Sequence, residues 1–491
     1  MNIMKNTIKS ILLLMVLVLN GCSTDLLNPS PKTSLGELQA FDTKDRVVGQ
    51  VNGMYAFMKN GNYLGGRYQV YNDIRADNFI AKNTNLVTGY STWNHSVITS
   101  TNEVINLWGA VYAAVNAINI FLEGLDTNWK AGTLTGKITE AEYNQFKSEG
   151  LTLRAMCYFD MLMLYAQPYN KDNGASPGLP LRLKANKTGA ENDLARSKVS
   201  EVYTQILADL NAAEPIAIDK YSTDLLNTTR VHKNTIIAFK TRVYLHMGDY
   251  AKVQTEAAKI VSATSPFVAS TGVPFGLTST FAGVFATPYT TKEAVFSMPF
   301  TSTDLAGTQN SLAWYHHPSS AESYYLNSAA GSTFSLMNAA DARKLLFVTG
   351  SVSNNTVYYC GKYTNFTVQS DYAPVLRYAE VLLNYAEALV RGGNAVTQKA
   401  VDLLNAVRTR SYPAGTYTLA SFSDVKSYLD AMLLERSIEF LGEGLRNMDL
   451  LRTLSIIPGK PGVSSIAPGT PTYIWPIPSS ELDINKLMTG N

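Results

Sequence analysis

Residues 376–410 read LRYAEVLLNYAEALVRGGNAVTQKAVDLLNAVRTR, and this stretch decides the fold. Small and apolar side chains recur in it at three- and four-residue steps, which predicts two amphipathic helices. The first stripe consists of Leu376, Ala379, Leu383, Ala386 and Val390, and the second of Ala400, Leu403, Leu404 and Val407. Because Gly392-Gly393-Asn394 separates the stripes and Pro413 follows the second, the stretch predicts a helical hairpin that ends before the proline.

A second stretch, residues 235–263, has the same organisation around a turn at Gly248-Asp249-Tyr250. Its predicted helices carry two apolar stripes, Ile236, Phe239, Val243 and Met247 in the first and Ala257, Ala258 and Val261 in the second. Two hairpins of about 34 residues resemble tetratricopeptide repeats, although Val253 stands where that repeat usually has alanine. Further helices are predicted over 107–125, 149–166, 199–213 and 425–451. The chain is therefore expected to be mainly α, a tetratricopeptide-like scaffold of helical hairpins.

The stretch between residues 265 and 371 has a different character. Gly, Ser, Thr and aromatic residues dominate it, helical periodicity lapses, and short strand-like runs occur at 295–298 and 357–359. The segment is too long for a simple connection between helices. We predict an irregular, loop-rich lobe with a few short strands, and long excursions of this kind often carry binding surfaces.

The composition of the 491 residues is that of a globular protein, with 46% hydrophobic and 16% charged residues. Lys and Arg number 41 against 39 Asp and Glu, and no long basic run is present, so nucleic acid is not an expected partner. The zinc patterns His-Glu-x-x-His and Cys-x-x-Cys do not occur, nor do Gly-x-Gly-x-x-Gly or Walker loops. We therefore predict no metal, no cofactor and no catalytic residue.

The N-terminus has the features of an export signal. Lys5 and Lys9 precede an apolar run at 11–19, which is too short to span the hydrocarbon core of a bilayer, about 30 Å thick. Leu19-Asn20-Gly21-Cys22 resembles a bacterial lipobox, which implies cleavage before Cys22 and acylation of this cysteine. The alternative is an ordinary signal peptide with a chance cysteine. Only Cys157 and Cys360 would remain, so a disulfide framework is not predicted.

Several separate blocks, all in the same order along the chain, resemble the SusD/RagB family. They are Leu153-Arg154-Ala155-Met156-Cys157-Tyr158-Phe159-Asp160, Gly178-Leu179-Pro180-Leu181, Ala195-Arg196-Ser197, the 376–388 helix with 404–408, the 435–450 block with Gly442-Glu443-Gly444, and Pro476-Ile477-Pro478. The resemblance implies a nutrient-binding lipoprotein of the outer membrane in Bacteroidetes. It would act as the lid of a SusC-like TonB-dependent transporter and bind an oligosaccharide. The RagB side of the family implies a peptide ligand instead.

Two aromatic clusters are the candidate ligand site. Tyr90, Trp93 and Asn94 lie in the polar stretch 89–101, and the second cluster, in the irregular lobe, consists of Trp314, Tyr315, His316, Tyr324 and Tyr325. Flat rings beside polar groups suit the C–H faces and hydroxyls of sugars, and the resembled family places its ligand contacts in these two regions. Alternatively, the rings wedge the lobe onto the scaffold. The nearby Asp73, Arg75, Asp77 and Asn78 are expected in turn and cap roles.

Three glutamates, Glu435, Glu439 and Glu443, are spaced four residues apart and so line one face of a predicted helix. Paired carboxylates serve as acid and base in glycoside hydrolases. The same spacing suits an ion network between helices, and we favour this interpretation because the resemblance places the block in the packed scaffold. We predict that the protein is not an enzyme, and a lipoprotein glycoside hydrolase using Glu439 or Glu443 is the less favoured alternative.

These interpretations divide the chain into five segments. Residues 1–21 form the signal peptide and 22–44 the lipidated tether. Residues 45–264 form the N-terminal helical region, 265–371 the irregular ligand lobe, and 372–491 the C-terminal helical region with its final loop. Acylated Cys22 would hold the protein on the outer membrane, facing the cell exterior.

Overall fold

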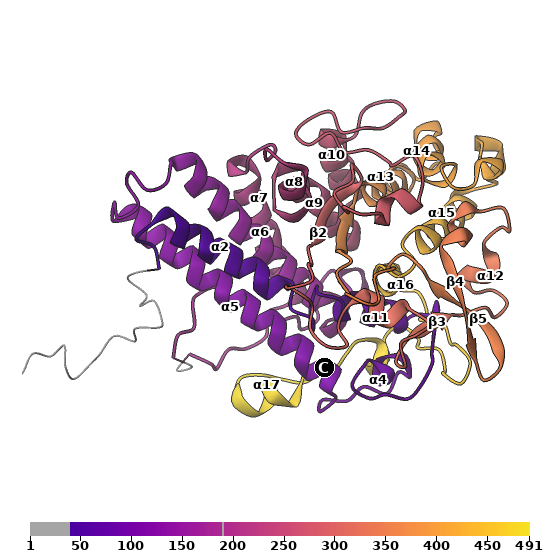
Figure 1. Cartoon of the computed structure of the whole chain (residues 1–491), viewed down its shortest axis with the longest axis horizontal. Coiled ribbons are helices and arrows are strands. Elements are labelled where there is room, and N and C mark those ends of the chain that lie inside the picture. Colours follow the sequence, from indigo (N-terminus) through magenta and orange to yellow (C-terminus); the bar gives the residue numbers. More distant parts are fainter. Residues whose placement is uncertain (1–39, 189–190) are drawn as a thin grey trace, which may run out of the picture.

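The computed structural model describes residues 40–188 and 191–491. The predicted signal peptide, the lipidation site Cys22 and the tether up to residue 39 lie outside the described residues. The architecture is mainly α with a few short strands, as the sequence predicts. In Figure 1 the long helices of the N-terminal half lie at the left end of the molecule and the strand hairpin of the lobe lies at the right end, whereas the C-terminus lies near the lower middle.

The N-terminal region is built on α2 (Lys44–Met58), α5 (Asn102–Lys130), α6 (Glu140–Tyr165) and α7 (Val199–Ala213). Helix α6 packs against the other three, and every residue from Ser148 to Tyr165 is buried. The sequence predicted this sandwiched helix from residue 149, but the helix starts earlier. A capping box formed by Thr139 and Glu142 satisfies free backbone groups of its first turn.

The two predicted hairpins are confirmed as α9 (Lys233–Met247) with α10 (Tyr250–Ile260) and α13 (Tyr378–Gly393) with α14 (Gln398–Arg408). Gly248 ends α9 in the left-handed region at φ +74°, which glycine adopts without strain. Helix α13 packs against both α9 and α10, so the hairpins form one layer with the short α8 (Asp224–Thr229) nearby. Leu376, predicted in the first stripe, lies instead in a strand.

The irregular lobe is joined to both helical regions by antiparallel strand pairs. Strand β1 (Phe79–Ala81) pairs with β3 (Tyr324–Leu326), and β2 (Ala294–Met298) pairs with β6 (Ala373–Arg377). Strands β4 (Phe347–Val352) and β5 (Asn355–Cys360) form a hairpin within the lobe. One cluster of buried apolar side chains includes residues of all three regions, so the lobe shares the core of the scaffold.

The prediction of one helix over 425–451 is wrong, because two helices occupy this stretch. Helix α15 (Val425–Glu439) ends before Gly442 and Gly444, both with φ above +80°, and α16 (Arg446–Arg452) follows. A Cβ atom at Gly444 would lie 2.7 Å from the Cα of Gln69 in α3 (Arg67–Ile74). The glycine therefore allows the connection to approach α3 closely. The remaining short helices are α4 (Tyr90–Trp93), α11 (Leu312–His316), α12 (Thr333–Leu336) and α17 (Ser479–Ile484).

Candidate functional site

The pairing of β1 with β3 brings the two predicted aromatic clusters together. Ile80 lies opposite Tyr325 in this ladder, although 245 residues separate them in sequence. The Tyr324 hydroxyl donates to the carbonyl oxygen of Thr88 at 3.0 Å, next to the start of α4. Helix α4 is fixed from the other side by the buried carboxylate of Glu103, which accepts from the backbone amides of Ser91 and Thr92.

Four of the predicted ligand residues are buried, namely Trp93, Tyr315, His316 and Tyr324. The indole Nε1 of Trp93 donates to the carbonyl oxygen of Phe79 at 2.8 Å, and the Tyr315 hydroxyl donates to that of Gln309 at 2.9 Å. These rings hold the lobe against the scaffold, which is the alternative role considered for them. Protein covers most of the surface of these four side chains, and their contact with a ligand stays a prediction.

The other four, Tyr90, Asn94, Trp314 and Tyr325, are half-buried and so retain an accessible part. Trp314 stacks on Phe366 with 5.6 Å between ring centroids, and His317 stacks on the same ring at 4.5 Å. Sequence reasoning missed Phe366, because it lies in a loop without periodicity and meets Trp314 only in the folded chain. We refer to the accessible parts of Tyr90, Trp314 and Tyr325 as the accessible aromatic surface.

A groove of about 530 Å³ lies near Trp93, whose ring is close to the lining residue Lys460. It is lined by Asp77, Asn327, the loop 329–332, the loop 458–461 and Val463. The ammonium group of Lys460 lies 5.3 Å from the Trp93 ring centroid and donates to the carbonyl oxygens of Ile74 and Ala76 at 2.5 and 2.9 Å. The groove was not predicted, since its walls come from two loops that carry no motif.

Asp73, Arg75, Asp77 and Asn78 hold distant segments together, contrary to the turn and cap roles expected for them. Asp73 accepts from the amide of Gly444 at 3.0 Å, and Arg75 donates to the carbonyl oxygen of Thr472 at 2.6 Å. Asp77 pairs with Arg446 at 3.0 Å, and the amide of Asn78 donates to the hydroxyl of Ser437 at 3.3 Å. The segment that precedes β1 is therefore fixed against the C-terminal region.

His316 is a buried imidazole between aromatic rings. Its ring centroid lies 5.1 Å from that of Phe79 and 5.6 Å from that of Tyr363, and both ring nitrogens lack a hydrogen-bond partner among the described residues. Burial, reinforced by the positive charge of Lys362, lowers the pKa of His316 to about 3. The side chain is therefore neutral in the folded protein at all moderately acidic pH values.

Because the pKa of His316 is lowered in the folded protein, we expect the free energy of unfolding to fall as the pH is lowered. We expect this fall to be smaller in His316→Phe. An unfolded histidine takes up a proton below its usual pKa of about 6.5, so acidification stabilises the unfolded chain. Between pH 7.5 and pH 5 this costs the native state about 2 kcal/mol at one such histidine. The variant is expected to lose correspondingly less stability over this range in urea denaturation. His317→Phe, at a half-exposed position, is the control, and equal pH profiles for wild type and His316→Phe would contradict the expectation.

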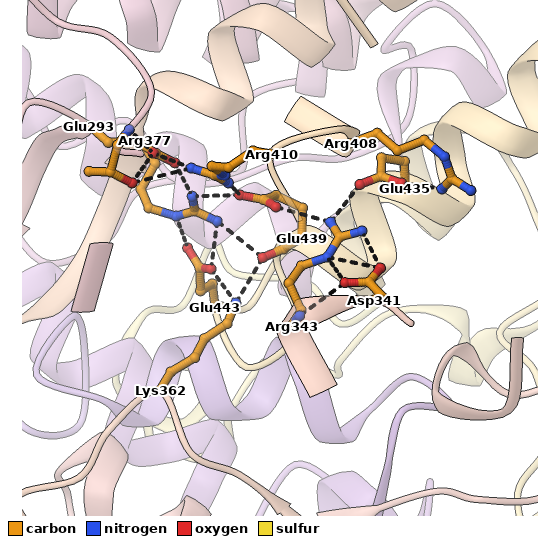
Figure 2. Close-up of polar contacts among 11 residues, drawn as sticks. Glu293, Asp341, Arg343, Lys362, Arg377, Arg408, Arg410, Glu435, Glu439 and Glu443 are labelled. Carbon is orange, nitrogen blue, oxygen red and sulfur yellow. Dashed lines mark hydrogen bonds and ion pairs between the residues drawn. The ribbon is translucent and has the colours of Figure 1, made fainter. Parts of the chain in front are cut away.

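Figure 2 shows that the three glutamates spaced along the 435–443 stretch belong to a buried ion network. Glu439 accepts from Arg377 at 2.9 Å and from Arg410 at 2.5 Å. Glu443 pairs with Lys362 and Arg377, each at 2.6 Å. The labelled network contains five acids and five bases, Glu293, Asp341, Glu435, Glu439 and Glu443 with Arg343, Lys362, Arg377, Arg408 and Arg410.

The electrostatics of this network do not suit a catalytic acid and base. Burial alone would raise the pKa of Glu439, but the guanidinium groups of Arg410, Arg377 and Arg343 outweigh it and hold the pKa well below its usual range. A general acid needs a raised pKa and access to the glycosidic oxygen. Glu439 is fully buried and Glu443 is 7% exposed, so the network fits the ion-pair interpretation.

One stretch has the spacing of a nucleophile elbow, Gly174-Ala175-Ser176-Pro177-Gly178. Its local structure differs from the strand–turn–helix that this motif requires. The Ser176 hydroxyl donates to the carboxylate of Asp172 at 2.5 Å, in a loop between α6 and α7. Within the described residues, no group of three His, Cys, Asp or Glu side chains is arranged to hold a metal ion.

Comparison with known proteins gives consistent results along the chain. A family described as "Starch-binding associating with outer membrane" matches residues 25–245, and the SusD family matches residues 347–491, together about three quarters of the chain. The chain is 23% identical to SusD-like protein P38 of Formosa agariphila, over 96% of this chain and 95% of that one. A SusD superfamily protein from Bacteroides fragilis has 27% identity and a TM-score of 0.80, over 91% of this chain and 99% of that one. Surface glycan-binding protein A from Bacteroides thetaiotaomicron, solved with laminarihexaose, has 16% identity and a TM-score of 0.70, over 91% and 99%.

Proposed function

Since the chain belongs to the SusD/RagB family, we propose that it is a glycan-binding lipoprotein that serves as the lid of a SusC-like TonB-dependent transporter. It captures oligosaccharides at the cell surface and delivers them to the transporter. The family description names starch binding and association with the outer membrane, and a structural neighbour was solved with laminarihexaose. Both support a carbohydrate as the ligand.

The observation that carries this proposal is that the segments bearing the accessible aromatic rings contact one another. Tyr90, Trp314 and Tyr325 lie on segments from distant parts of the chain. The β1–β3 pairing, the hydrogen bond from Tyr324 to Thr88 and the ring contact between Tyr315 and Tyr324 bring these segments together. Half-buried rings are held rigidly, so little side-chain entropy is lost when a sugar ring stacks on them. The side chains of Trp314 and Tyr90 are therefore the proposed stacking positions.

The membrane attachment in this proposal is acylated Cys22, followed by the tether over 22–44. An extended chain from Cys22 to the start of α2 would reach at most about 75 Å. This length allows the folded body to move relative to the membrane while it stays attached. Replacement of Cys22 by Ala tests the anchor, since we expect the protein to leave the membrane fraction.

The experiment that tests the ligand class is affinity electrophoresis in gels that contain laminarin, amylopectin, xylan, galactomannan, alginate or carrageenan. We expect slower migration with at least one polysaccharide and no release of sugar during incubation. Binding of a peptide pool without any glycan binding would replace the proposal by the peptide-binding alternative. Hydrolysis abolished by Glu443→Gln would instead establish the hydrolase alternative.

Trp314→Ala and Tyr90→Ala are each expected to lower the affinity for the retained glycan about tenfold, which corresponds to about 1.4 kcal/mol. The physical reason is the loss of a stacking face while the core below it stays intact. Isothermal titration with the retained glycan checks this result. Trp129→Ala is the matched control, because Trp129 is also half-buried and stacked, on Tyr143 at 4.5 Å, at the far end of α5. Unchanged affinity in both site variants would remove these residues from the site.

A further inference from the structure

A second cavity lies at the β2–β6 strand pair and shares no lining residue with the groove near Trp93. Side chains of both strands line it, together with side chains of the loops 284–289 and 362–372. The space open to the centre of a water molecule is about 20 Å³, and a bound water needs about 10–15 Å³. The cavity therefore admits a group of the size of one water or one ammonium, but not a sugar ring.

Four aromatic rings line this cavity. Tyr289 and Tyr372 stack on each other with 4.9 Å between ring centroids, and both are half-buried, so they lie on its solvent side. Phe285 and Tyr363 meet edge to face with 6.2 Å between centroids. The face of an aromatic ring carries partial negative charge and attracts a cation within about 6 Å of its centre. These rings therefore favour a positively charged group over an anion.

The carboxylate of Asp371 lines the same cavity and is 7% exposed. It accepts from the backbone amides of Thr364 at 3.2 Å and Asn365 at 2.9 Å, and from the Tyr289 hydroxyl at 3.2 Å. These donors are all neutral, and within the described part of the chain no Lys, Arg or His forms an ion pair with Asp371. Burial accordingly raises the pKa of Asp371. Because a buried charge without a counter-charge is costly, a cation in the cavity would be favoured.

Two cationic side chains, Lys362 and Arg377, also line the cavity, but acids of the buried network compensate them. Each forms an ion pair with Glu443 at 2.6 Å, as Figure 2 shows. The ammonium group of Lys362 also donates to the carbonyl oxygen of Glu439 at 2.8 Å. The five acids and five bases labelled in the network are formally neutral together. The uncompensated charge at the cavity is therefore the negative charge of Asp371.

The hydroxyl group of Ser297 adds a second polar atom to the cavity lining. Ser297 is 4% exposed and lies in β2 opposite Pro374, which is also a lining residue. Among the described residues its side chain has no hydrogen-bond partner. A serine hydroxyl can accept a hydrogen bond, and a carboxylate offers about four acceptor positions, of which three are used at Asp371. Both side chains can therefore accept from a donor in the cavity.

We infer that this cavity binds a primary alkylammonium group, the chemistry of a lysine side chain. The ammonium group would donate to Asp371 and Ser297, and its alkyl chain would leave the cavity along the rings of Tyr289 and Tyr372. A primary ammonium has three N–H donors and is small enough for the space, whereas a quaternary ammonium has no donor and is too large. The inference goes beyond the proposed function, because it requires no glycan.

Isothermal titration of the full-length protein with Nα-acetyl-lysine methylamide tests this site. We expect this amine to bind, and its Nε-acetylated form, which lacks the charge, not to bind. Asp371→Asn removes the carboxylate charge but keeps an oxygen that can accept from the Asn365 amide. We expect this variant to bind the amine about tenfold more weakly, or worse. Asp402→Asn is the matched control, because it removes the same charge at an exposed position of α14, and we expect wild-type binding.

Ser297→Val provides a second variant, which fills the cavity from β2 and removes the hydroxyl group. We expect the same loss of binding with a Tm close to that of wild type. Titration with glucosamine distinguishes the source of the amine, because binding of glucosamine alone would support the ammonium site and assign it to an amino sugar. Equal binding of the free and acetylated lysine derivatives would overturn the inference.

Wild-type affinity in both Asp371→Asn and Ser297→Val would also overturn it, as would the absence of binding by either amine. Retention of the wild-type protein by polysaccharides is measured separately. Glycan binding without amine binding therefore overturns the ammonium site and leaves the proposed function in place. Amine binding lost in both variants, without retention by any glycan, supports the site while the proposed function fails.

Discussion

Arg377→Met is expected to lower the free energy of unfolding by about 3–5 kcal/mol. Arg377 is 2% exposed and donates to Glu293 at 2.6 Å, to Glu439 at 2.9 Å and to Glu443 at 2.6 Å. The variant leaves these carboxylates buried with fewer partners, and a buried charge without compensation is costly. Methionine keeps much of the side-chain volume, so the loss reports the charge rather than a cavity.

Urea denaturation of the purified protein measures this loss. Lys426→Met is the matched control, because Lys426 pairs with Asp430 on the exposed face of α15, where both side chains are more than half exposed. Exposed ion pairs are screened by water and salt, so no measurable shift of the midpoint is expected in the control. Equal midpoints for the two variants would show that the network around Arg377 does not hold the C-terminal helices together.

Trp93→Ala is expected to cost about 3–5 kcal/mol of stability, since the indole is 7% exposed and packs in the main core. The substitution leaves a cavity under α4, removes the hydrogen bond to Phe79 and uncovers the ammonium group of Lys460. Thermal unfolding checks this result. Trp314→Ala is the comparison variant. Because Trp314 is half-buried, we expect this substitution to lower the affinity for the glycan and to change the Tm little. If Trp93→Ala has the Tm of wild type but loses affinity for the glycan, Trp93 contacts the ligand and does not mainly stabilise the core.

The helical scaffold was predictable because its signals are local. The stripes of 235–263 and 376–410, with glycine-containing turns between them, correspond to α9, α10, α13 and α14. The break between α15 and α16 was not predictable from periodicity, because the apolar pattern continues through it. After Glu439 the chain turns at Gly442 and Gly444, and Gly444 approaches Gln69, more than 370 residues away in sequence.

The candidate site was also predictable only in part, because contacts between residues distant in sequence decide which of its side chains are accessible. Residue type placed Tyr90, Trp93, Trp314 and Tyr324 in two clusters, but exposure depends on which neighbours cover each ring. The β1–β3 ladder covers Trp93 and Tyr324 and leaves parts of Tyr90 and Trp314 accessible. Likewise, the four-residue spacing of Glu435, Glu439 and Glu443 indicated an ion network, although Glu443 lies beyond the end of α15 and not on one helix face with the others. Its partners in the lobe, such as Arg343, carry no sequence signal.

The contacts of the segment that precedes β1 also join residues that lie far apart in the sequence. Arg75 bonds to Asn447 across 372 residues of sequence, and Asn78 bonds to Ser437 across 359. Closing such large loops costs entropy before the contacts can stabilise them, so we expect these pairings to form late in folding. The helical hairpins can form early from neighbouring residues. A fragment that ends before α15 would lack Ser437 and Asn447, the side chains that fix the segment before β1 in place.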